Sequence, residues 1–247
     1  MNFVILRFDT LASTNSEALE QARRGADEGL CIVARQQSAG RGRHGRTWQS
    51  PPDSGLYFSL VLRPRTGPEF FPLLTFIAAV AVFETLRELY RLEPDIKWAN
   101  DVLAGNKKIC GILAEAAETE KGPAVILGIG INFTSENFPP EIAGIATSIE
   151  AESGVKVDPE ILLPALTKNI ARFYGFLHEE NGVEAIKNEW AARSSYHSGK
   201  DVRVILPSET LIGTTCGLDE HGGLRVKQPD GEIRTVHAGD VENLRAV

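Results

Sequence analysis

A short loop gathers chemical groups that suit an anionic ligand. Residues 40–48 read Gly-Arg-Gly-Arg-His-Gly-Arg-Thr-Trp. The glycines allow tight turns and a close approach to a ligand, because they carry no Cβ. The arginines offer planar guanidinium groups that match phosphate or carboxylate oxygens, and Trp48 adds a flat face on which a nucleobase can stack. This arginine loop favours an anionic, nucleotide-containing ligand, with a solvated basic surface loop as the alternative.

The arginine loop does not fit the common phosphate-binding motifs. Gly40, Gly42 and Gly45 have the spacing of the dinucleotide fingerprint, but that motif follows a strand and opens a helix. Here Pro51 and Pro52 follow shortly afterwards, and such a segment cannot begin a regular helix. A Walker loop is excluded as well, since neither Gly-Lys-Ser nor Gly-Lys-Thr occurs in the chain.

Metal-dependent and hydrolytic chemistry find no support in the sequence. The five histidines show no ligand spacing, and Cys110 has no Cys or His nearby, so a structural metal site is not expected. The Gly-x-Ser-x-Gly turn of serine hydrolases does not occur either. The remaining candidates are cations in apolar, strand-like segments, chiefly Lys97 and Lys108. Each lysine taken singly could also be a guard against aggregation on an edge strand.

Composition narrows the class of protein. The 247 residues are 43% hydrophobic and 24% charged, as in a globular protein, and the net charge of −7 argues against bulk affinity for nucleic acid. The apolar segment 70–90 contains Glu84, Arg87 and Glu88, so we expect a buried helix and no contact with a membrane. Three widely spaced cysteines and the lack of a signal peptide predict a cytoplasmic protein.

The segments that carry these groups lie in or beside predicted strands. Strands are predicted at 3–8, 31–36, 56–62, 96–98 and 125–131, and helices at about 14–25, from Pro72, at 159–180 and at 183–193. Gly105-Asn106 predicts a hairpin turn between strands at 102–103 and 107–113.

Two further features concern the boundaries of these elements. Thr14 and Glu17 fit a capping box at the first helix. The segment 133–157 is rich in Pro, Gly, Ser and Thr, and we expect a long mobile connection of the kind that acts as a lid.

The pattern changes near the C-terminus. A polar linker at 194–200 is followed by short alternating runs separated by turns, which predicts a small all-β barrel of about fifty residues docked on the larger domain. We therefore divide the chain into a larger domain at 1–194, where the candidate site residues lie, and a β domain at 195–247.

Five blocks in chain order resemble those of the biotin protein ligases (biotin–acetyl-CoA-carboxylase ligases). The blocks are Ser13-Thr14-Asn15, 37–48, Lys97-Trp98-Ala99-Asn100-Asp101, 108–113 and 128–132. The likeness extends from about Ser13 to the C-terminus. It implies an α+β fold with a mixed β-sheet flanked by helices, like that of class II aminoacyl-tRNA synthetases, and a C-terminal SH3-like β-barrel.

The resemblance also implies a reaction. Biotin and ATP would form biotinyl-5′-AMP, and the biotinyl group would then pass to a lysine of a biotin carboxyl carrier protein domain. Biotin would be bound by small polar residues, by the arginine loop and by bare backbone, namely Ser13, Thr14, Asn15, Gln37, Gly40, Arg41, Gly42, Arg43, Lys108, Gly111, Gly128 and Gly130.

ATP would be bound by cationic, aromatic and amide side chains, namely Arg41, Arg43, Trp48, Lys97, Asn100, Asp101, Lys108 and Asn132. Lys108 is our first choice for the catalytic residue, assisted by Arg43. Mg²⁺ would arrive with the ATP phosphates and lie near Asp101, with no metal held by the protein alone.

Two departures from the family pattern stand out. Ala99 occupies a position where the family usually has proline. The chain begins at the catalytic domain, with no room before Phe3 for the DNA-binding domain of bifunctional members, so we expect no sequence-specific DNA binding. Homodimer formation stays open. The alternatives are a lipoate–protein ligase and a non-catalytic nucleotide- or RNA-binding module, against which the acidic net charge counts.

Overall fold

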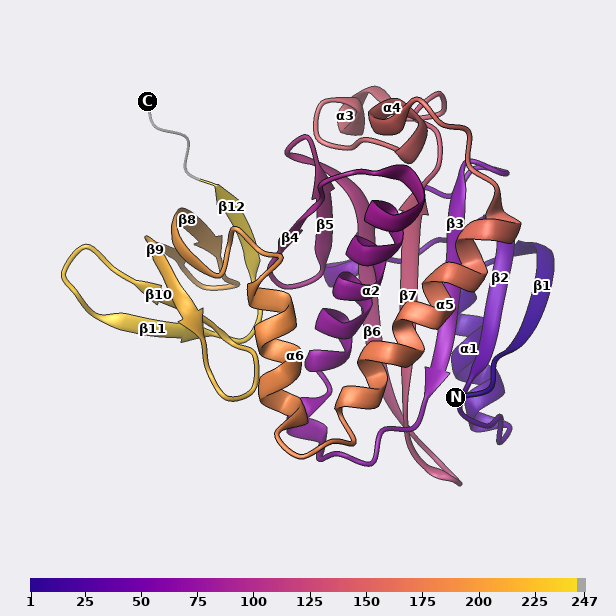
Figure 1. Ribbon diagram of the computed structural model, residues 1–247, viewed down its shortest axis with the longest axis horizontal. Coiled ribbons are helices and arrows are strands. Elements are labelled where there is room, and N and C mark those ends of the chain that lie inside the picture. Colours follow the sequence, from indigo (N-terminus) through magenta and orange to yellow (C-terminus); the bar gives the residue numbers. More distant parts are fainter. Residues whose placement is uncertain (244–247) are drawn as a thin grey trace.

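The computed structural model describes residues 1–243 and is built on a seven-stranded mixed sheet (Figure 1). Its strands are β1 (Val4–Leu11), β2 (Leu30–Gln37), β3 (Gly55–Leu62), β4 (Asp95–Lys97), β5 (Asp101–Ala104), β6 (Lys107–Thr119) and β7 (Gly122–Asn132). Their order is β1-β2-β3-β7-β6-β5-β4. Only the β1–β2 pairing is parallel among these described strands, so the predicted mixed sheet is confirmed.

Helices cover both faces of this sheet. They are α1 (Thr14–Arg23), α2 (Leu73–Tyr90), α5 (Pro159–Phe176) and α6 (Gly182–Ala191). Helix α1 is amphipathic, and its small residues Ala18 and Ala22 pack against Ile32 and Ile126 on one face. Helix α2 is apolar nearly all round because it lies between the other face of the sheet and helices α5 and α6.

The segment Pro68–Tyr90, which contains the 3₁₀ turn η2 (Pro68–Phe70) and α2, is long and apolar enough to cross a membrane. However, 72% of its most apolar window is buried inside the protein. This burial agrees with the core helix that its internal charges predicted.

The first helix begins differently from the capping-box prediction. Ser13 is the N-cap, with an extended backbone and a side chain that accepts a hydrogen bond from Ser16 N. Thr14 is already helical, and its Oγ1 lies 2.8 Å from Ser59 Oγ on β3. The capping-box prediction was therefore wrong, because tertiary partners take the hydroxyl that the local pattern assigned to the cap. Ser13 therefore caps the helix, whereas Thr14 connects it to β3.

The predicted hairpin is confirmed. Strands β5 and β6 pair antiparallel around Gly105 and Asn106. Both turn residues have left-handed backbones, with φ of 55° and 63°. A two-residue hairpin turn requires this conformation, which glycine and asparagine adopt most readily.

The segment 133–157 is more ordered than its composition suggested. It forms two short helices, α3 (Pro140–Ala143) and α4 (Ile149–Ser153), and Ser148 caps the second. Between them the chain runs beside β6, where Lys108 N donates to Ile145 O and Thr147 N donates to Lys108 O, both at 2.9 Å. A serine cap and two hydrogen bonds to β6 give this segment a defined path. Its expected role as a mobile lid stays a prediction.

The C-terminal residues form a second, five-stranded antiparallel sheet. Its strands are β8 (Ser198–Ile205), β9 (Thr210–Leu218), β10 (Leu224–Lys227), β11 (Ile233–Val236) and β12 (Asp240–Asn243), in the order β11-β10-β9-β8-β12. Within residues 1–243 no pairing joins β11 to β12, so the predicted all-β region is confirmed but a closed SH3-like barrel is not. This sheet lies beside α6 and near β4 (Figure 1).

Candidate functional site

One cavity collects the predicted site residues. It has a volume of about 1010 Å³, and its walls come from the large sheet, the arginine loop, the segment after β7 and strand β12. Every residue predicted to bind biotin or ATP lines it except Gly40. A Cβ at Gly40 would lie 2.3 Å from Trp48 O, so the bare backbone of Gly40 serves the closure of the loop itself.

The arginine loop is a small hairpin. Arg41 and Thr47 form an isolated β-bridge, Gly42 N donates to Arg46 O at 2.7 Å, and Trp48 N donates to Gly40 O at 2.9 Å. At its tip lies the 3₁₀ turn η1 (Arg43–Gly45). Backbone hydrogen bonds therefore fix the shape of the loop, and its side chains remain available for contacts outside it.

Each arginine of the loop reaches a different part of the protein. Arg41 forms an ion pair with Glu115 on β6. Arg43 Nη1 donates to Asn100 Oδ1 at 2.9 Å, in the turn between β4 and β5. Arg46 pairs with Asp240, the first residue of β12. These contacts stretch the loop across the cavity, from the large sheet to the C-terminal sheet.

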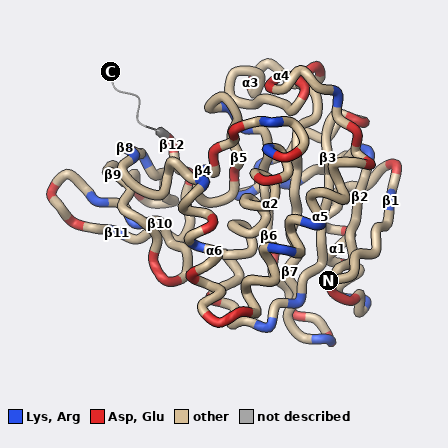
Figure 2. Tube along the Cα trace, viewed as in Figure 1, with Lys and Arg blue, Asp and Glu red and all other residues tan. Residues whose placement is uncertain are grey.

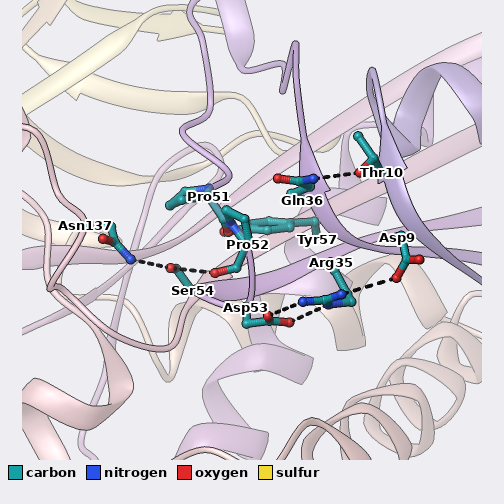
Figure 3. Close-up of polar contacts among 10 residues, drawn as sticks. All are labelled: Asp9, Thr10, Arg35, Gln36, Pro51, Pro52, Asp53, Ser54, Tyr57 and Asn137. Carbon is teal, nitrogen blue, oxygen red and sulfur yellow. Dashed lines mark hydrogen bonds and ion pairs between the residues drawn. The ribbon is translucent and has the colours of Figure 1, made fainter.

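The chain leaving the loop is anchored separately (Figure 3). Tyr57 Oη donates to Pro51 O at 2.8 Å, and Arg35 Nε donates to Asp53 Oδ1 at 2.9 Å. Both anchoring side chains belong to strands of the large sheet. The return segment is therefore tied to β2 and β3 by side-chain hydrogen bonds.

A compact polar pocket lies at the N-terminus of α1. Gln37 Oε1 accepts from Thr14 N at 2.8 Å and lies 3.2 Å from Thr14 Oγ1. Gln37 Nε2 donates to Ser50 Oγ at 2.7 Å. Ser59 Oγ lies 2.6 Å from Asn15 Oδ1. Thr14, Asn15 and Ser59 are at most 5% exposed, so their orientations are set by these mutual contacts. Such a pocket offers neutral donors and acceptors to a polar head group.

Glycines let side chains lie directly on the sheet backbone. A Cβ at Gly128 would be 2.0 Å from Asn15 Oδ1, and one at Gly130 would be 2.5 Å from Cε2 of Trp48. A Cβ at Gly111 would also meet the indole, 2.9 Å from Cζ3 of Trp48. In this structure, then, Gly128 makes room for Asn15, whereas Gly111 and Gly130 make room for Trp48.

The opposite end of the cavity is cationic. Lys108 Nζ lies 2.6 Å from Asp101 Oδ1 and 5.4 Å from the centroid of the Trp48 ring. Burial lowers the pKa of Lys97 below the ordinary lysine value, while the nearby Asp101 carboxylate opposes part of the shift. Asn132 Nδ2 donates to Thr147 O at 2.9 Å and so fixes the segment after β7. Among the described residues, no three His, Cys, Asp or Glu side chains are placed together to hold a metal ion.

The amino-acid sequence matches two protein-family models. Residues 8–132 match the Biotin/lipoate A/B protein ligase family, and residues 197–242 match the Biotin protein ligase C terminal domain. The chain is 36% identical over 237 residues to the Bifunctional ligase/repressor BirA of Bacillus spizizenii, covering 95% of this chain and 72% of that protein. The chain belongs to the biotin protein ligase family.

Other relatives agree. This ligase is 36% identical to the Biotin--[acetyl-CoA-carboxylase] ligase of Paracoccus denitrificans, covering 89% of this chain and 92% of that protein. Its fold matches the biotin protein ligase from Aquifex aeolicus in complex with biotin and ATP, with a TM-score of 0.83, 30% identity and 98% of this chain covered. The predicted family is therefore confirmed, and the chain is an enzyme of the ligase class.

Sequence reasoning missed several residues of this ligase that contact the predicted site. Three of them lie on strands far along the chain from the residues that they contact, namely Ser59, Glu115 and Asp240. The fourth, Ser50, follows the arginine loop directly and bonds Gln37. Glu115 alone left a visible signal, as a single charge in the apolar run Leu113-Ala114-Glu115-Ala116-Ala117.

Proposed function

We propose that the protein activates biotin with ATP as biotinyl-5′-AMP and transfers the biotinyl group to a lysine of a biotin carboxyl carrier domain. The observation that carries this proposal is the polarity of the cavity. A neutral polar pocket at the N-terminus of α1 is joined to a cluster of ammonium and guanidinium groups. Biotin has a neutral ureido ring at one end and a carboxylate at the other, and the cavity of about 1010 Å³ has room for a nucleotide as well.

In the proposed binding mode, the ureido ring occupies the polar pocket. Thr14 Oγ1 and the Gln37 side chain present hydroxyl and amide groups that match the two N–H groups and the carbonyl of the ring. The apolar chain then follows the bare backbone at Gly111 and Gly130, which requires the Trp48 indole to share or leave that surface. The carboxylate ends beside Lys108.

In the first proposed step, an oxygen of the biotin carboxylate attacks the α-phosphorus of ATP. The bond from that phosphorus to the bridging oxygen breaks, and pyrophosphate leaves. Lys108 and Arg43 would offset the charge that both reactants bring, since phosphoryl transfer depends on positioning and electrostatic stabilisation. Asp101 holds the Lys108 ammonium in place, and Asn100 does so for the Arg43 guanidinium.

Asp101 also fits the chemistry of a magnesium ligand. Mg²⁺ in nucleotide sites is held by one or two carboxylates together with substrate phosphates, and Asp101 is a partly exposed carboxylate on the cavity wall. When bound, Mg²⁺ would neutralise phosphate charge.

In the second proposed step, the neutral amine of the carrier lysine attacks the carbonyl carbon of the mixed anhydride. The carbonyl carbon–oxygen bond to AMP breaks, an amide forms, and the amine loses a proton. Exclusion of water protects such a reactive intermediate, and the arginine loop spans the cavity in the position that this requires.

The three free thiols of the described residues support a reducing compartment, and we place the reaction in the cytoplasm.

Pyrophosphate exchange tests the proposal. The protein is incubated with ATP, Mg²⁺ and labelled pyrophosphate, with biotin, with lipoate or with neither. Label should enter ATP only with biotin, and a carrier domain should then accept biotin at its lysine but not after Lys→Arg replacement. Exchange that depends on lipoate would support a lipoate ligase instead. No exchange with either acid would contradict adenylation.

A further inference from the structure

Glu115 contacts a residue of the polar pocket and a residue of the arginine loop. It lies in the middle of β6, and its side chain is 25% exposed. One carboxylate oxygen, Oε2, accepts a hydrogen bond from Asn15 Nδ2 at 2.9 Å. The other, Oε1, pairs with Arg41 of the arginine loop. One side chain thus contacts the polar pocket and the loop at once.

On the pocket side, Glu115 fixes the orientation of an amide. Asn15 is 5% exposed, and its Oδ1 lies 2.6 Å from Ser59 Oγ. Its Nδ2 donates to Glu115 and, at 3.3 Å, to Leu113 O. The shorter and charge-assisted bond is the one to Glu115, and bonds of this kind are about twice as strong as neutral ones. The protein itself therefore engages both N–H donors of Asn15.

On the loop side, Glu115 provides an anion for a cation that is otherwise well exposed. The Arg41 side chain is 43% exposed, and its Nη1 also lies 3.4 Å from Ser16 Oγ. Arg41 forms the β-bridge with Thr47 at the base of the hairpin. A contact that holds Arg41 in place therefore also holds this base in place. The contact with Glu115 joins this base to the large sheet.

We propose that Glu115 is a positioning residue that couples the polar pocket to the arginine loop. A head group that settles against Thr14 and Asn15 favours the amide orientation that Glu115 holds, and the same carboxylate keeps Arg41 over the cavity. Loss of the carboxylate charge releases the loop and weakens ligand retention together. The identity of the head group as a ureido ring rests on the proposed function, whereas the contact between Glu115 and the loop does not.

The first test needs no ligand. Glu115→Gln keeps a side-chain oxygen for Asn15 but removes the charge that attracts Arg41. Hydrogen–deuterium exchange of the amides at 40–48 in the free protein should become about tenfold faster, the size expected for loss of a charge-assisted contact. Glu118→Gln, an exposed carboxylate on the same strand, should leave the exchange at 40–48 unchanged. Equal exchange in the parent and Glu115→Gln would overturn the proposal.

The second test measures coupling. Glu115→Gln and Arg41→Gln should each weaken biotin binding about tenfold, and the double variant should lose less than the product of the two single losses, because the two residues share one contact. An additive loss would overturn the coupling, and unfolding midpoints equal to the parent's would exclude general destabilisation. If the parent itself fails to bind biotin, the proposed function fails, and exchange of the free loop alone decides the role of Glu115.

Discussion

Lys108 enters the cavity from β6, and its ammonium is held 2.6 Å from the Asp101 carboxylate. We predict that Lys108→Ala lowers the rate of biotin-dependent pyrophosphate exchange about 100-fold or more, because a positioned cation is lost where charge develops. The neighbouring Lys107→Ala is the matched control, since adjacent strand residues point to opposite faces and Lys107 is exposed. An exchange rate near that of the parent would contradict the role of Lys108, provided that thermal unfolding is unchanged.

The lowered pKa of Lys97 predicts that the use of ATP depends on pH. Burial lowers the pKa of its ammonium, so the charge is lost at a lower pH than for an ordinary lysine. The kcat/KM for ATP should therefore fall on the alkaline side at a pH below 10.5, the ordinary value, because this quantity reports groups of the free enzyme. Lys97→Arg keeps the charge and should move the fall to higher pH.

The lowered pKa of Lys97 also makes the free energy of unfolding depend on pH. The unfolded chain holds the Lys97 proton more tightly than the folded protein, so this group opposes folding below its lowered pKa. The penalty should shrink as the pH rises from that lowered pKa towards 10.5. Lys168→Arg, at an exposed position of α5, should alter neither pH profile. A profile shared by Lys97→Arg and the parent would show that Lys97 does not bind ATP.

At the scale of elements, β6 and β7 form a wall whose bare backbone receives side chains from elsewhere. We predict that Gly128→Ala weakens biotin binding more than tenfold, because its Cβ would lie 2.0 Å from Asn15 Oδ1. Displacing Asn15 should also lower the free energy of unfolding by about 1–3 kcal/mol, as for an overpacked core. Isothermal titration and chemical denaturation measure the two effects.

A helical glycine offers the control for this substitution. A Cβ at Gly175 in α5 would meet no atom within 4 Å, so Gly175→Ala should leave biotin binding unchanged. It should also raise the free energy of unfolding by up to about 1 kcal/mol. Full biotin affinity in Gly128→Ala would mean that Asn15 can move without consequence for the pocket.

At the scale of the whole molecule, two sheets share one hydrophobic core and one cavity. The core includes Val80 of α2 together with Val202 and Leu224 of the C-terminal sheet. Basic and acidic residues are scattered over the described chain (Figure 2), and the net charge is −7, so the cationic end of the cavity is a local feature of an acidic protein. The arginine loop connects the two sheets through Arg46 and Asp240.

That connection predicts a role for the C-terminal sheet in retaining the intermediate. Asp240→Asn should release biotinyl-AMP faster, because the loop loses its anchor on β12. The Arg46 side chain is 66% exposed, and an ion pair of this kind is worth less than about 1 kcal/mol, so the change should stay below about fivefold. Release is measured by stray labelling of bystander lysines. Asp230→Asn, in a turn of the same sheet, should not increase it.

Local sequence determined much of this protein. The backbone preferences of Gly105 and Asn106 determine the hairpin turn, and the length of the apolar run with its internal charges determines that α2 is a buried helix. The blocks that resemble the ligase family also placed all predicted site residues except Gly40 around one cavity.

Tertiary structure decided which residues hold those blocks in place. Asn15 meets Glu115 across 100 positions of the chain, and Arg46 meets Asp240 across 194. No local periodicity records such contacts, because they arise only when sheet pairing brings distant strands together. Contacts between distant strands also explain why Ser13, and not Thr14, caps α1. The Thr14 hydroxyl contacts Ser59 on β3 and Gln37 on β2.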